Sequence, residues 1–124
     1  MAVETHQIWV VEDDLELLDL LCLVLRRAGL DVRAFSDGQD VLREIADGAR
    51  ADLLVTDHHL GRVQGLDIVD ALRAEDARTP VLLVTAFADA RVRARAAESE
   101  DVELVDKPCD VYRLRRRVLE RLAT

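Results

Sequence analysis

Five polar residues lie within two positions after the ends of short apolar runs of this chain: Glu12, Asp13, Asp57, Thr85 and Lys107. An all-oxygen cluster suits Mg²⁺, which takes one or two carboxylates and keeps several waters. Two carboxylates roughly 4 Å apart repel by about 4 kcal/mol at an effective dielectric constant of about 20, so such a cluster needs a counter-charge. With a lysine opposite the cation and a hydroxyl nearby, the central carboxylate is a candidate nucleophile toward a phosphoryl group.

Five strand-helix units are predicted to position these side chains. The apolar runs cover residues 8–11, 32–35, 53–55, 81–84 and 102–105, and helical patterns follow at about 15–28, 37–47, 65–75, 88–99 and 110–122. This alternation is typical of a parallel sheet with helices on both faces. Because the carboxyl ends of parallel strands share one edge of the sheet, the five polar residues are expected to converge there.

The apolar runs differ in pattern, and the difference predicts their order in the sheet. The first, third and fourth runs are unbroken, as expected of strands that helices cover on both faces. Segments 31–35 and 102–104 alternate apolar and polar residues, which is typical of strands with one exposed face. The second and fifth strands are therefore expected at the edges, flanking the first, third and fourth.

Helix capping is the competing interpretation of acidic residues that follow strands. It accounts for Asp14 or Asp37, and segment 36–39 has the spacing of a capping box at a helix start. Gly29 stands where a glycine would end the first helix. Capping does not account for an acid pair, an isolated aspartate, a threonine and a Lys-Pro pair at the ends of four different strands.

Length and composition are typical of a small cytoplasmic domain. The chain has 124 residues, and we expect one domain over residues 1–124 with a structured core of about 7–122. Its longest apolar run, 20–25, is far shorter than the roughly 20 residues that a membrane-spanning helix needs, and residues 1–7 do not read as a secretory signal. Cys22 and Cys109 are far apart and form no CxxC motif, which argues against a disulfide framework or a thiolate zinc site.

The charge distribution argues against nucleic-acid binding. The formal net charge is −8, and four aromatic residues leave little for base stacking. Residues 1–85 carry 8 basic and 17 acidic side chains, whereas residues 86–124 carry 9 basic and 8 acidic ones. The arginine-rich last third is therefore the expected protein-binding part, and an output function is expected from a partner or a further segment.

Several short segments match the pattern of a known family: Val10-Val11-Glu12-Asp13, Asp52-Leu53-Leu54-Val55-Thr56-Asp57, Gly65, Val84-Thr85-Ala86 and Asp106-Lys107-Pro108. In this order and spacing they resemble the receiver domain of two-component response regulators, the chemotaxis-type receiver family. The resemblance covers essentially the whole chain. It implies a flavodoxin-like, doubly wound α/β fold: a (βα)5 three-layer sandwich with a five-stranded parallel sheet in the order 2-1-3-4-5.

The resemblance implies a role for each residue that would handle the phosphoryl group. Asp57 matches the phosphoacceptor, which would take a phosphoryl group from a phosphohistidine. Lys107 would pair with a phosphoryl oxygen, and Thr85 would move to donate a hydrogen bond to another oxygen after phosphorylation. The Lys107-Pro108 bond matches the family's cis peptide.

The resemblance also implies a Mg²⁺ site, with Mn²⁺ as the alternative ion. Asp13 and Asp57 would be direct ligands. Glu12 would act through water, and His59 would contribute its backbone carbonyl. Adjacent histidines such as His58 and His59 can chelate a transition metal, but a solvated pair in a loop is the preferred interpretation.

Several positions depart from the family's pattern. Gly61 stands where a proline is usual, Gln64 replaces a common aspartate, and Leu104 stands where many receivers have an aromatic switch residue. Cys109 replaces a common phenylalanine, and we expect a buried filler there, because a reactive thiol needs an exposed electropositive setting. Phe87 occupies a position that, together with residue 59, tunes the phosphoryl lifetime in the family.

The resemblance implies a signalling phosphoacceptor rather than an enzyme. Its partners would be a sensor histidine kinase or histidine phosphotransfer protein, and a downstream effector protein or covalently linked output domain, without direct contact to nucleic acid or membrane.

The fourth helix, fifth strand and fifth helix form the family's usual partner or dimer surface. The fourth helix has only Val92 as a large apolar anchor, so it is a candidate moving part. The first helix is apolar nearly all round from Leu15 to Leu25, which leaves a second homodimer mode open.

Three other functions would place different requirements on the same residues. A receiver that signals by binding alone, without phosphorylation, would not need an intact set of Asp57, Thr85 and Lys107. A phosphatase that forms an aspartyl phosphate uses Asp-x-Asp, but the second position here is His59. A flavodoxin-like cofactor binder needs a phosphate-cradling loop of Gly, Ser or Thr, where this chain has Glu12-Asp13-Asp14.

Overall fold

Strands and helices alternate along the described chain. The computed structural model describes residues 5–86 and 88–123. Its strands are β1 (Gln7–Val11), β2 (Asp31–Phe35), β3 (Leu53–Asp57), β4 (Val81–Thr85) and β5 (Val102–Asp106). Its helices are α1 (Leu15–Arg27), α2 (Gly38–Ala46), α3 (Gly65–Ala74), α4 (Ala90–Glu98) and α5 (Val111–Leu122). The strands pair in parallel in the order β2-β1-β3-β4-β5, which confirms the predicted order.

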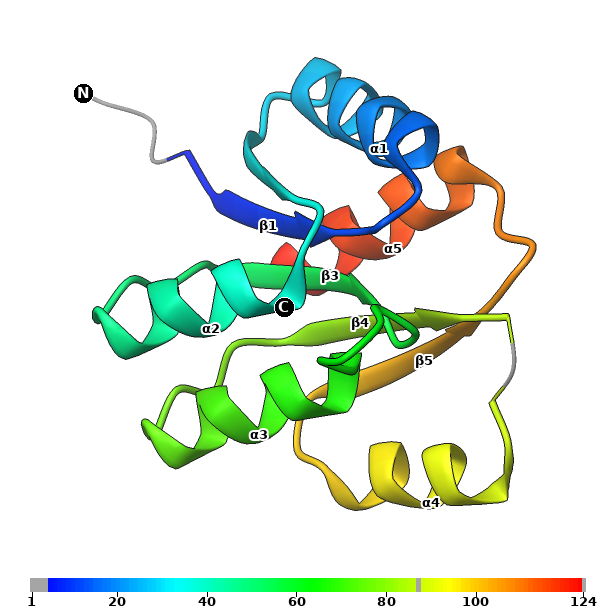
Figure 1. Cartoon of the computed structure of the whole chain (residues 1–124). Helices are drawn as coiled ribbons and strands as arrows, with labels where there is room; N and C mark the ends of the chain where they lie inside the picture. Colours follow the sequence, from blue (N-terminus) through cyan, green and yellow to red (C-terminus); the bar gives the residue numbers. More distant parts are fainter. Residues whose placement is uncertain (1–4, 87, 124) are drawn as a thin grey trace.

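Helices cover both faces of the sheet and make a three-layer sandwich. Figure 1 shows α1 and α5 on one face of the sheet and α2, α3 and α4 on the other. Side chains alternate along β1: Ile8 and Val10 enter the apolar cluster under α1 and α5, whereas Trp9 and Val11 enter the cluster under the other three helices. The flavodoxin-like (βα)5 prediction is confirmed. Among the described residues, no helix combines the length and the apolar character needed to cross a membrane.

Burial along the strands accounts for their order. All five positions of β3 and β4 are buried, and so are all positions of β1 except its first residue. By contrast, β2 buries only Val32 and Phe35, and every residue of β5 is half-buried or exposed. The edge strands β2 and β5 contribute apolar side chains to both clusters, but they have a neighbouring strand on one side only and are therefore less completely covered than the central strands. The expected edge positions of β2 and β5 are confirmed.

Three strands extend further than the apolar runs predict. Asp57, Thr85 and Asp106, which the sequence places after strands, are the last residues of β3, β4 and β5. In the ladder Asp57 lies opposite Val84, and Thr85 lies opposite Asp106. Backbone hydrogen bonds form a ladder whatever the polarity of the side chains. The polar residues are therefore held by paired strands rather than by free loops.

The first helix begins and ends as predicted. The carboxylate of Asp14 accepts hydrogen bonds from the backbone amides of Glu16 at 3.1 Å and Leu17 at 3.2 Å, so Asp14 is the N-cap of α1. Gly29 follows the end of α1 with a φ of +90°, a conformation that glycine adopts without the strain of a Cβ.

The predicted capping box at residues 36–39 is wrong. Asp37, not Ser36, is the N-cap of α2, and its carboxylate accepts from the backbone amide of Gln39 at 2.9 Å. An N-cap carboxylate satisfies one of the unpaired amides of the first turn, so the helix starts one residue later and leaves Ser36 outside it.

Candidate functional site

The ends of β1 and β3 bring three carboxylates together. β1 and β3 are neighbours, with Val11 opposite Thr56. Glu12 and Asp13 therefore leave β1 beside Asp57, and one carboxylate oxygen of each lies within 4.8 Å of the others. Glu12 is only 3% exposed and Asp57 only 8%, whereas Asp13 is exposed. The structure thus places the three acidic residues in one pocket, as expected from the strand ends.

Lys107 supplies a positive charge to this pocket from the end of the edge strand β5. It follows β5, which lies two strands from β3. Its Nζ lies 2.9 Å from Glu12 Oε1 and 3.2 Å from Asp57 Oδ2, and its side chain is 23% exposed. The backbone amide of Lys107 donates to the carbonyl of Thr85 at 2.8 Å, and Lys107-Pro108 is a cis peptide. An ammonium on a flexible stem can face two carboxylates at once, and this is the single lysine in the chain.

Burial and charge shift two pKa values in this pocket. Burial raises the pKa of Glu12 and the charge of Asp57 adds to the rise, while hydrogen bonds from Lys107 and from the backbone of Asp14 oppose it. Burial alone would lower the pKa of Lys107, but the hydrogen bonds and charges of Glu12 and Asp57 outweigh it, so the pKa of Lys107 lies above its ordinary value. Lys107 is therefore charged at neutral pH.

One backbone amide and the Lys107 side chain hold the carboxylate of Asp57 in place. Asp57 Oδ1 accepts from the backbone amide of His59 at 3.2 Å, and Oδ2 faces Lys107. The backbone amide of His58 donates to the carbonyl of Val84 at 3.0 Å, which continues the pairing of β3 with β4 beyond Asp57. Both carboxylate oxygens of Asp57 thus have a partner, and the chain that follows it is fixed to β4.

Gly65 lets α3 begin close against the strand that carries Asp57. The backbone amide of Gly65 donates to the carbonyl of His58 at 2.8 Å. A Cβ at this position would lie 2.7 Å from the backbone oxygen of Asp57 and 2.6 Å from Leu83 Cδ1, which is closer than van der Waals contact allows. In the sequence Gly65 is only part of a family pattern, and the structure supplies the physical reason for the glycine.

Gly65→Ala is expected to lower the free energy of unfolding by about 1–3 kcal/mol, because a backbone oxygen must move to admit the methyl group. Gly38→Ala is the matched control and is expected to cost less. A Cβ at Gly38 would lie 2.8 Å from Val63 Cγ1 and 2.9 Å from Val63 Cβ, so the loop that carries Val63 must shift, whereas at Gly65 the backbone of the central strand β3 must shift. Urea denaturation of both variants measures the difference, and equal losses would contradict the importance of the contact with the Asp57 backbone.

Thr85 lies at the same sheet edge as Asp57, but toward the other helical layer. Thr85 is fully buried at the end of β4. Because side chains alternate along a strand, it shares a face with Leu83, which belongs to the cluster under α2, α3 and α4. Asp57 lies opposite Val84, which belongs to the cluster under α1 and α5.

Both His58 and His59 were expected to be exposed to solvent. This prediction is wrong for His58, which is buried. His58 is 8% exposed, because its backbone continues the ladder between β3 and β4 and carries the side chain inside. Burial lowers the pKa of His58, and the charge of His59 acts in the same direction. The ring of His59 is exposed and meets the His58 ring edge-on, with 4.9 Å between the centroids.

Positions that depart from the family pattern lie around the pocket. Leu104 is half-buried against the cluster under α2, α3 and α4. Cys109, expected to be buried, is only half-buried beside the cluster under α1 and α5, and burial raises the pKa of its thiol. It lines a cavity of about 450 Å³ that opens beside Asp57 between α1 and α5. Phe87 lies outside the described residues.

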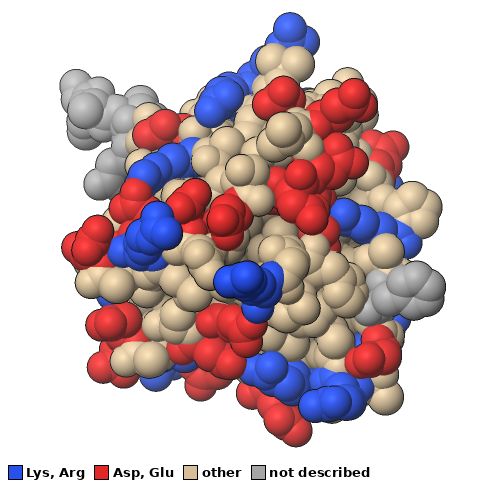
Figure 2. All heavy atoms as spheres, in the orientation of Figure 1, with Lys and Arg blue, Asp and Glu red and all other residues tan. Residues whose placement is uncertain are grey.

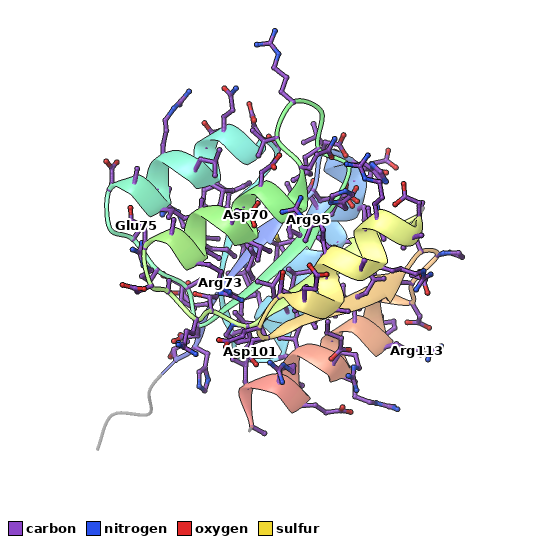
Figure 3. All side chains as sticks on the ribbon, turned by 90° about the horizontal axis from the view of Figure 1, so that it is seen from below. Asp70, Arg73, Glu75, Arg95, Asp101 and Arg113 are labelled. Carbon is purple, nitrogen blue, oxygen red and sulfur yellow. The ribbon has the colours of Figure 1, made fainter. Side chains whose placement is uncertain are left out.

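A clamp at the far end of α3 is not apparent from the sequence. The guanidinium of Arg73 donates to the backbone carbonyls of Ala77 at 2.8 Å, Thr79 at 3.0 Å and Glu100 at 2.7 Å. It thereby ties the end of α3 to the segment before β4 and to the turn before β5, near Asp101 (Figure 3). Its partners are backbone oxygens, which carry no side-chain pattern that could signal the contact.

The fourth helix is weakly anchored, as its composition predicts. Val92 and Ala96 are its only buried residues. Two ion pairs connect its exposed side, Arg95 with Asp70 of α3 at 2.6 Å and Arg93 with Asp106 at 3.1 Å (Figure 3 labels the first pair). Exposed ion pairs contribute only about 0–1 kcal/mol each, so little apolar burial or ion pairing opposes a shift of α4.

Acidic and basic side chains interleave in space although they are unequally distributed along the chain. Figure 2 shows both signs mixed over the face that it presents. Basic residues of α5 pair with acidic residues at or near β5, namely Arg117 with Glu103 and Arg121 with Asp101. The fold therefore does not divide this face into an acidic and a basic half.

Comparison with known proteins agrees with this geometry. A family model described as the response regulator receiver domain matches residues 8–119. The chain is 34% identical over 122 residues to the DNA-binding response regulator MtrA of Mycolicibacterium smegmatis, which covers 98% of this chain and 53% of MtrA. The chain thus spans about half the length of this relative.

Solved structures share the fold. A CheY-like receiver domain protein from Methanospirillum hungatei has a TM-score of 0.86 and 20% identity, covering 97% of this chain and 95% of that one. The receiver domain of the sensor histidine kinase PA1611 from Pseudomonas aeruginosa, with a magnesium ion coordinated in its active-site cleft, has a TM-score of 0.81 and 22% identity, covering 98% and 100%. Since the family model extends from β1 into the last turns of α5, the chain belongs to the response regulator receiver domain family.

Proposed function

We propose that this domain is a Mg²⁺-dependent phosphoryl acceptor, in which Asp57 takes a phosphoryl group from a phosphohistidine. The observation that carries the proposal is the contact of Lys107 Nζ with both Glu12 and Asp57. Burying two carboxylates beside one ammonium carries a desolvation cost that a well-packed apolar group would avoid. Such a pocket therefore favours a functional role, and it combines a nucleophile with a cation that can meet phosphoryl oxygens.

The donor atoms present fit Mg²⁺. The carboxylate oxygens of Glu12, Asp13 and Asp57 lie within 4.8 Å of one another, and an all-oxygen set suits a hard cation. Lys107 balances only one of three negative charges, so a divalent cation would balance the others. Asp13 and Asp57 would be direct ligands, with Glu12 acting through water. The backbone carbonyl of His59 would complete the protein's contribution, and Mn²⁺, which also prefers oxygen, would serve as the alternative. When bound, the cation would offset negative charge on the phosphoryl oxygens.

The transfer itself would be an in-line displacement at phosphorus. An oxygen of Asp57 forms the new bond while the bond from phosphorus to the donor's histidine nitrogen breaks, and the electron pair stays on that nitrogen. Lys107 offsets charge on the phosphoryl oxygens, and the His59 amide, 3.2 Å from Asp57 Oδ1, keeps the carboxylate oriented. Thr85 would then move across the sheet edge and donate its hydroxyl to a phosphoryl oxygen.

Incubation of the 124-residue chain with acetyl phosphate and Mg²⁺ tests this proposal. We expect an adduct with the mass of one phosphoryl group, which hydroxylamine removes because it cleaves acyl phosphates. EDTA is expected to prevent the adduct. If no adduct forms with Mg²⁺ present, the proposal is wrong, and a receiver that signals by binding alone becomes the better interpretation.

Asp13→Asn is expected to weaken Mg²⁺ binding by about tenfold or more, since changes even to groups that only support metal ligands cost about 10–100-fold. Asp14→Asn is the matched control, because Asp14 is the next acidic residue along the chain and caps α1, a role that asparagine also fills. We expect its Mg²⁺ affinity to stay within about twofold of the wild type. Isothermal titration calorimetry measures both. Equal effects of the two substitutions would contradict a specific role of Asp13.

The proposed partners follow from the same chemistry. The phosphoryl donor would be a sensor histidine kinase or a histidine phosphotransfer protein, and the setting would be the cytoplasm. MtrA is a DNA-binding response regulator of which this chain matches about half, so we place the output in a linked domain or a separate effector protein. The surface of α4, β5 and α5 would report phosphorylation, because α4 buries so little. The domain would turn over no substrate besides its own aspartyl phosphate.

A further inference from the structure

Helix α1 exposes three large apolar side chains, two of which, Leu20 and Leu23, lie close together on its outer face. Leu15, Leu20 and Leu23 are 63%, 44% and 46% exposed, and they are three of the five large hydrophobic side chains that are exposed among the described residues. In Figure 1, α1 lies at the outside of the layer that it forms with α5. Exposed apolar side chains grouped on one helix are typical of a contact with another protein surface.

Four residues form one stripe along this face. Glu16, Leu20, Leu23 and Arg27 are all exposed and follow one another at spacings of four, three and four residues. At about 100° per residue, they lie within roughly 60° of one another around the helix axis. This is the spacing with which side chains line the seam between two packed helices. The stripe is acidic at its N-terminal end, apolar in its middle and basic at its C-terminal end.

The charges of this stripe make no ion pair with other described residues. In residues 5–86 and 88–123, ion pairs involve α2, α3, α4 and α5, and none of them includes a residue of α1. The face of α4, β5 and α5 pairs some of its charges internally, through Arg93 with Asp106, Arg117 with Glu103 and Arg121 with Asp101. Glu16 and Arg27 therefore remain for a contact outside the chain.

We propose that a second copy of this chain packs antiparallel against α1 across a twofold axis. Glu16 of one copy then meets Arg27 of the other at both ends, and Leu20 meets Leu23 in the middle. The two pairings share one midpoint, between residues 21 and 22, so a single register satisfies both. A twofold contact requires such self-complementarity, because the same surface serves on both copies. The charge pattern therefore favours a second copy over an unrelated partner.

The contact is small, so the dimer is weak. α1 has 13 residues, which corresponds to a helix of about 20 Å. A pair of such helices buries less than the roughly 1,200 Å² of standard stable interfaces, and we expect a dissociation constant on the order of tens of micromolar or weaker. The inference concerns the outer face of α1 and does not depend on phosphoryl transfer.

Sedimentation equilibrium of the 124-residue chain over a concentration series tests the dimer, with charge-reversal variants as the specific probe. Glu16→Arg and Arg27→Glu, each alone, are expected to weaken the dimer at least about tenfold, because like charges then meet at both ends. An equimolar mixture of the two variants is expected to restore it, because each reversed charge then meets an opposite one. Arg116→Glu, an exposed arginine on α5, is the matched control and is expected to change nothing.

Restoration in the mixture distinguishes the proposed contact from loss of folding, which mixing cannot repair. Circular dichroism of each variant provides an independent measure of folding. A wild-type chain that stays monomeric at every concentration overturns the proposal. A dimer that neither variant weakens, or a mixture that stays monomeric, overturns it as well, because either outcome places the contact elsewhere.

Discussion

Asp57→Asn is expected to abolish the phosphoryl adduct that the wild-type chain forms with acetyl phosphate and Mg²⁺. The asparagine amide has nearly the shape of the carboxylate, but it is not a nucleophile toward phosphorus. Its oxygen can still accept a hydrogen bond where Asp57 faces Lys107 Nζ at 3.2 Å or the His59 amide at 3.2 Å, so the local fold is expected to persist. Intact-mass spectrometry measures the change from a full adduct to none.

Asp14→Asn provides the control for this experiment, because Asp14 is an exposed acidic residue of the segment after β1 and forms no ion pair with Lys107, whose partners are Glu12 and Asp57. We expect it to retain the adduct. An adduct that persists in Asp57→Asn would show that another residue accepts the phosphoryl group. Loss of the adduct in both variants would mean that the loop after β1, rather than the acceptor alone, is required.

Lys107→Met is expected to lower the free energy of unfolding by about 2–3 kcal/mol in EDTA. Removing one partner of a fully buried ion pair costs about 3–5 kcal/mol, and the partial exposure of Lys107 reduces that figure. The loss arises because the side chains of Glu12 and Asp57, which are 4% and 9% exposed, would remain together without a counter-charge. Urea denaturation measures it. Added Mg²⁺ is expected to recover part of the stability, because it neutralises the same carboxylates.

Arg95→Met is the matched control for Lys107→Met, because it breaks the pair with Asp70, whose two side chains are 48% and 60% exposed. Screening by water limits the expected loss to under about 1 kcal/mol. A loss as large as that of Lys107→Met would contradict the importance of burial at the pocket. A loss for Lys107→Met that Mg²⁺ leaves unchanged would contradict the sharing of these carboxylates between lysine and cation.

The stability that Lys107 contributes is also expected to depend on pH in one direction. The pKa of Lys107 lies above its ordinary value of 10.5 in the folded chain, because Glu12 and Asp57 favour its charged form. The folded state therefore holds this proton more tightly, and the contribution is fully present below pH 10.5. It is lost as pH rises through the folded pKa. The stability difference between wild type and Lys107→Met should stay constant from neutral pH upward and shrink only in that alkaline range.

Most of the architecture could be predicted from local patterns. Unbroken apolar runs predicted that β1, β3 and β4 are central, and alternating segments predicted that β2 and β5 are at the edges. These predictions succeed because a central strand is buried almost completely and an edge strand only in part, so the apolar content of a strand reflects its position. At the start of α2, the cap expected at Asp37 is confirmed and the capping box expected over residues 36–39 is wrong, because Ser36 and Asp37 are both good caps and the choice between them depends on the path of the chain out of β2.

The chain order also sufficed to predict which polar residues approach one another, since parallel strands end at one edge of their sheet. It could not show that a single lysine contacts both Glu12 and Asp57, that His58 is buried, or that Arg73 clamps three backbone carbonyls. It also could not show that α1 alone among the helices keeps its charges out of ion pairs with described residues. Periodicity records which side of an element faces the core, whereas these contacts depend on distances between distant segments, which exist only after the five units have packed.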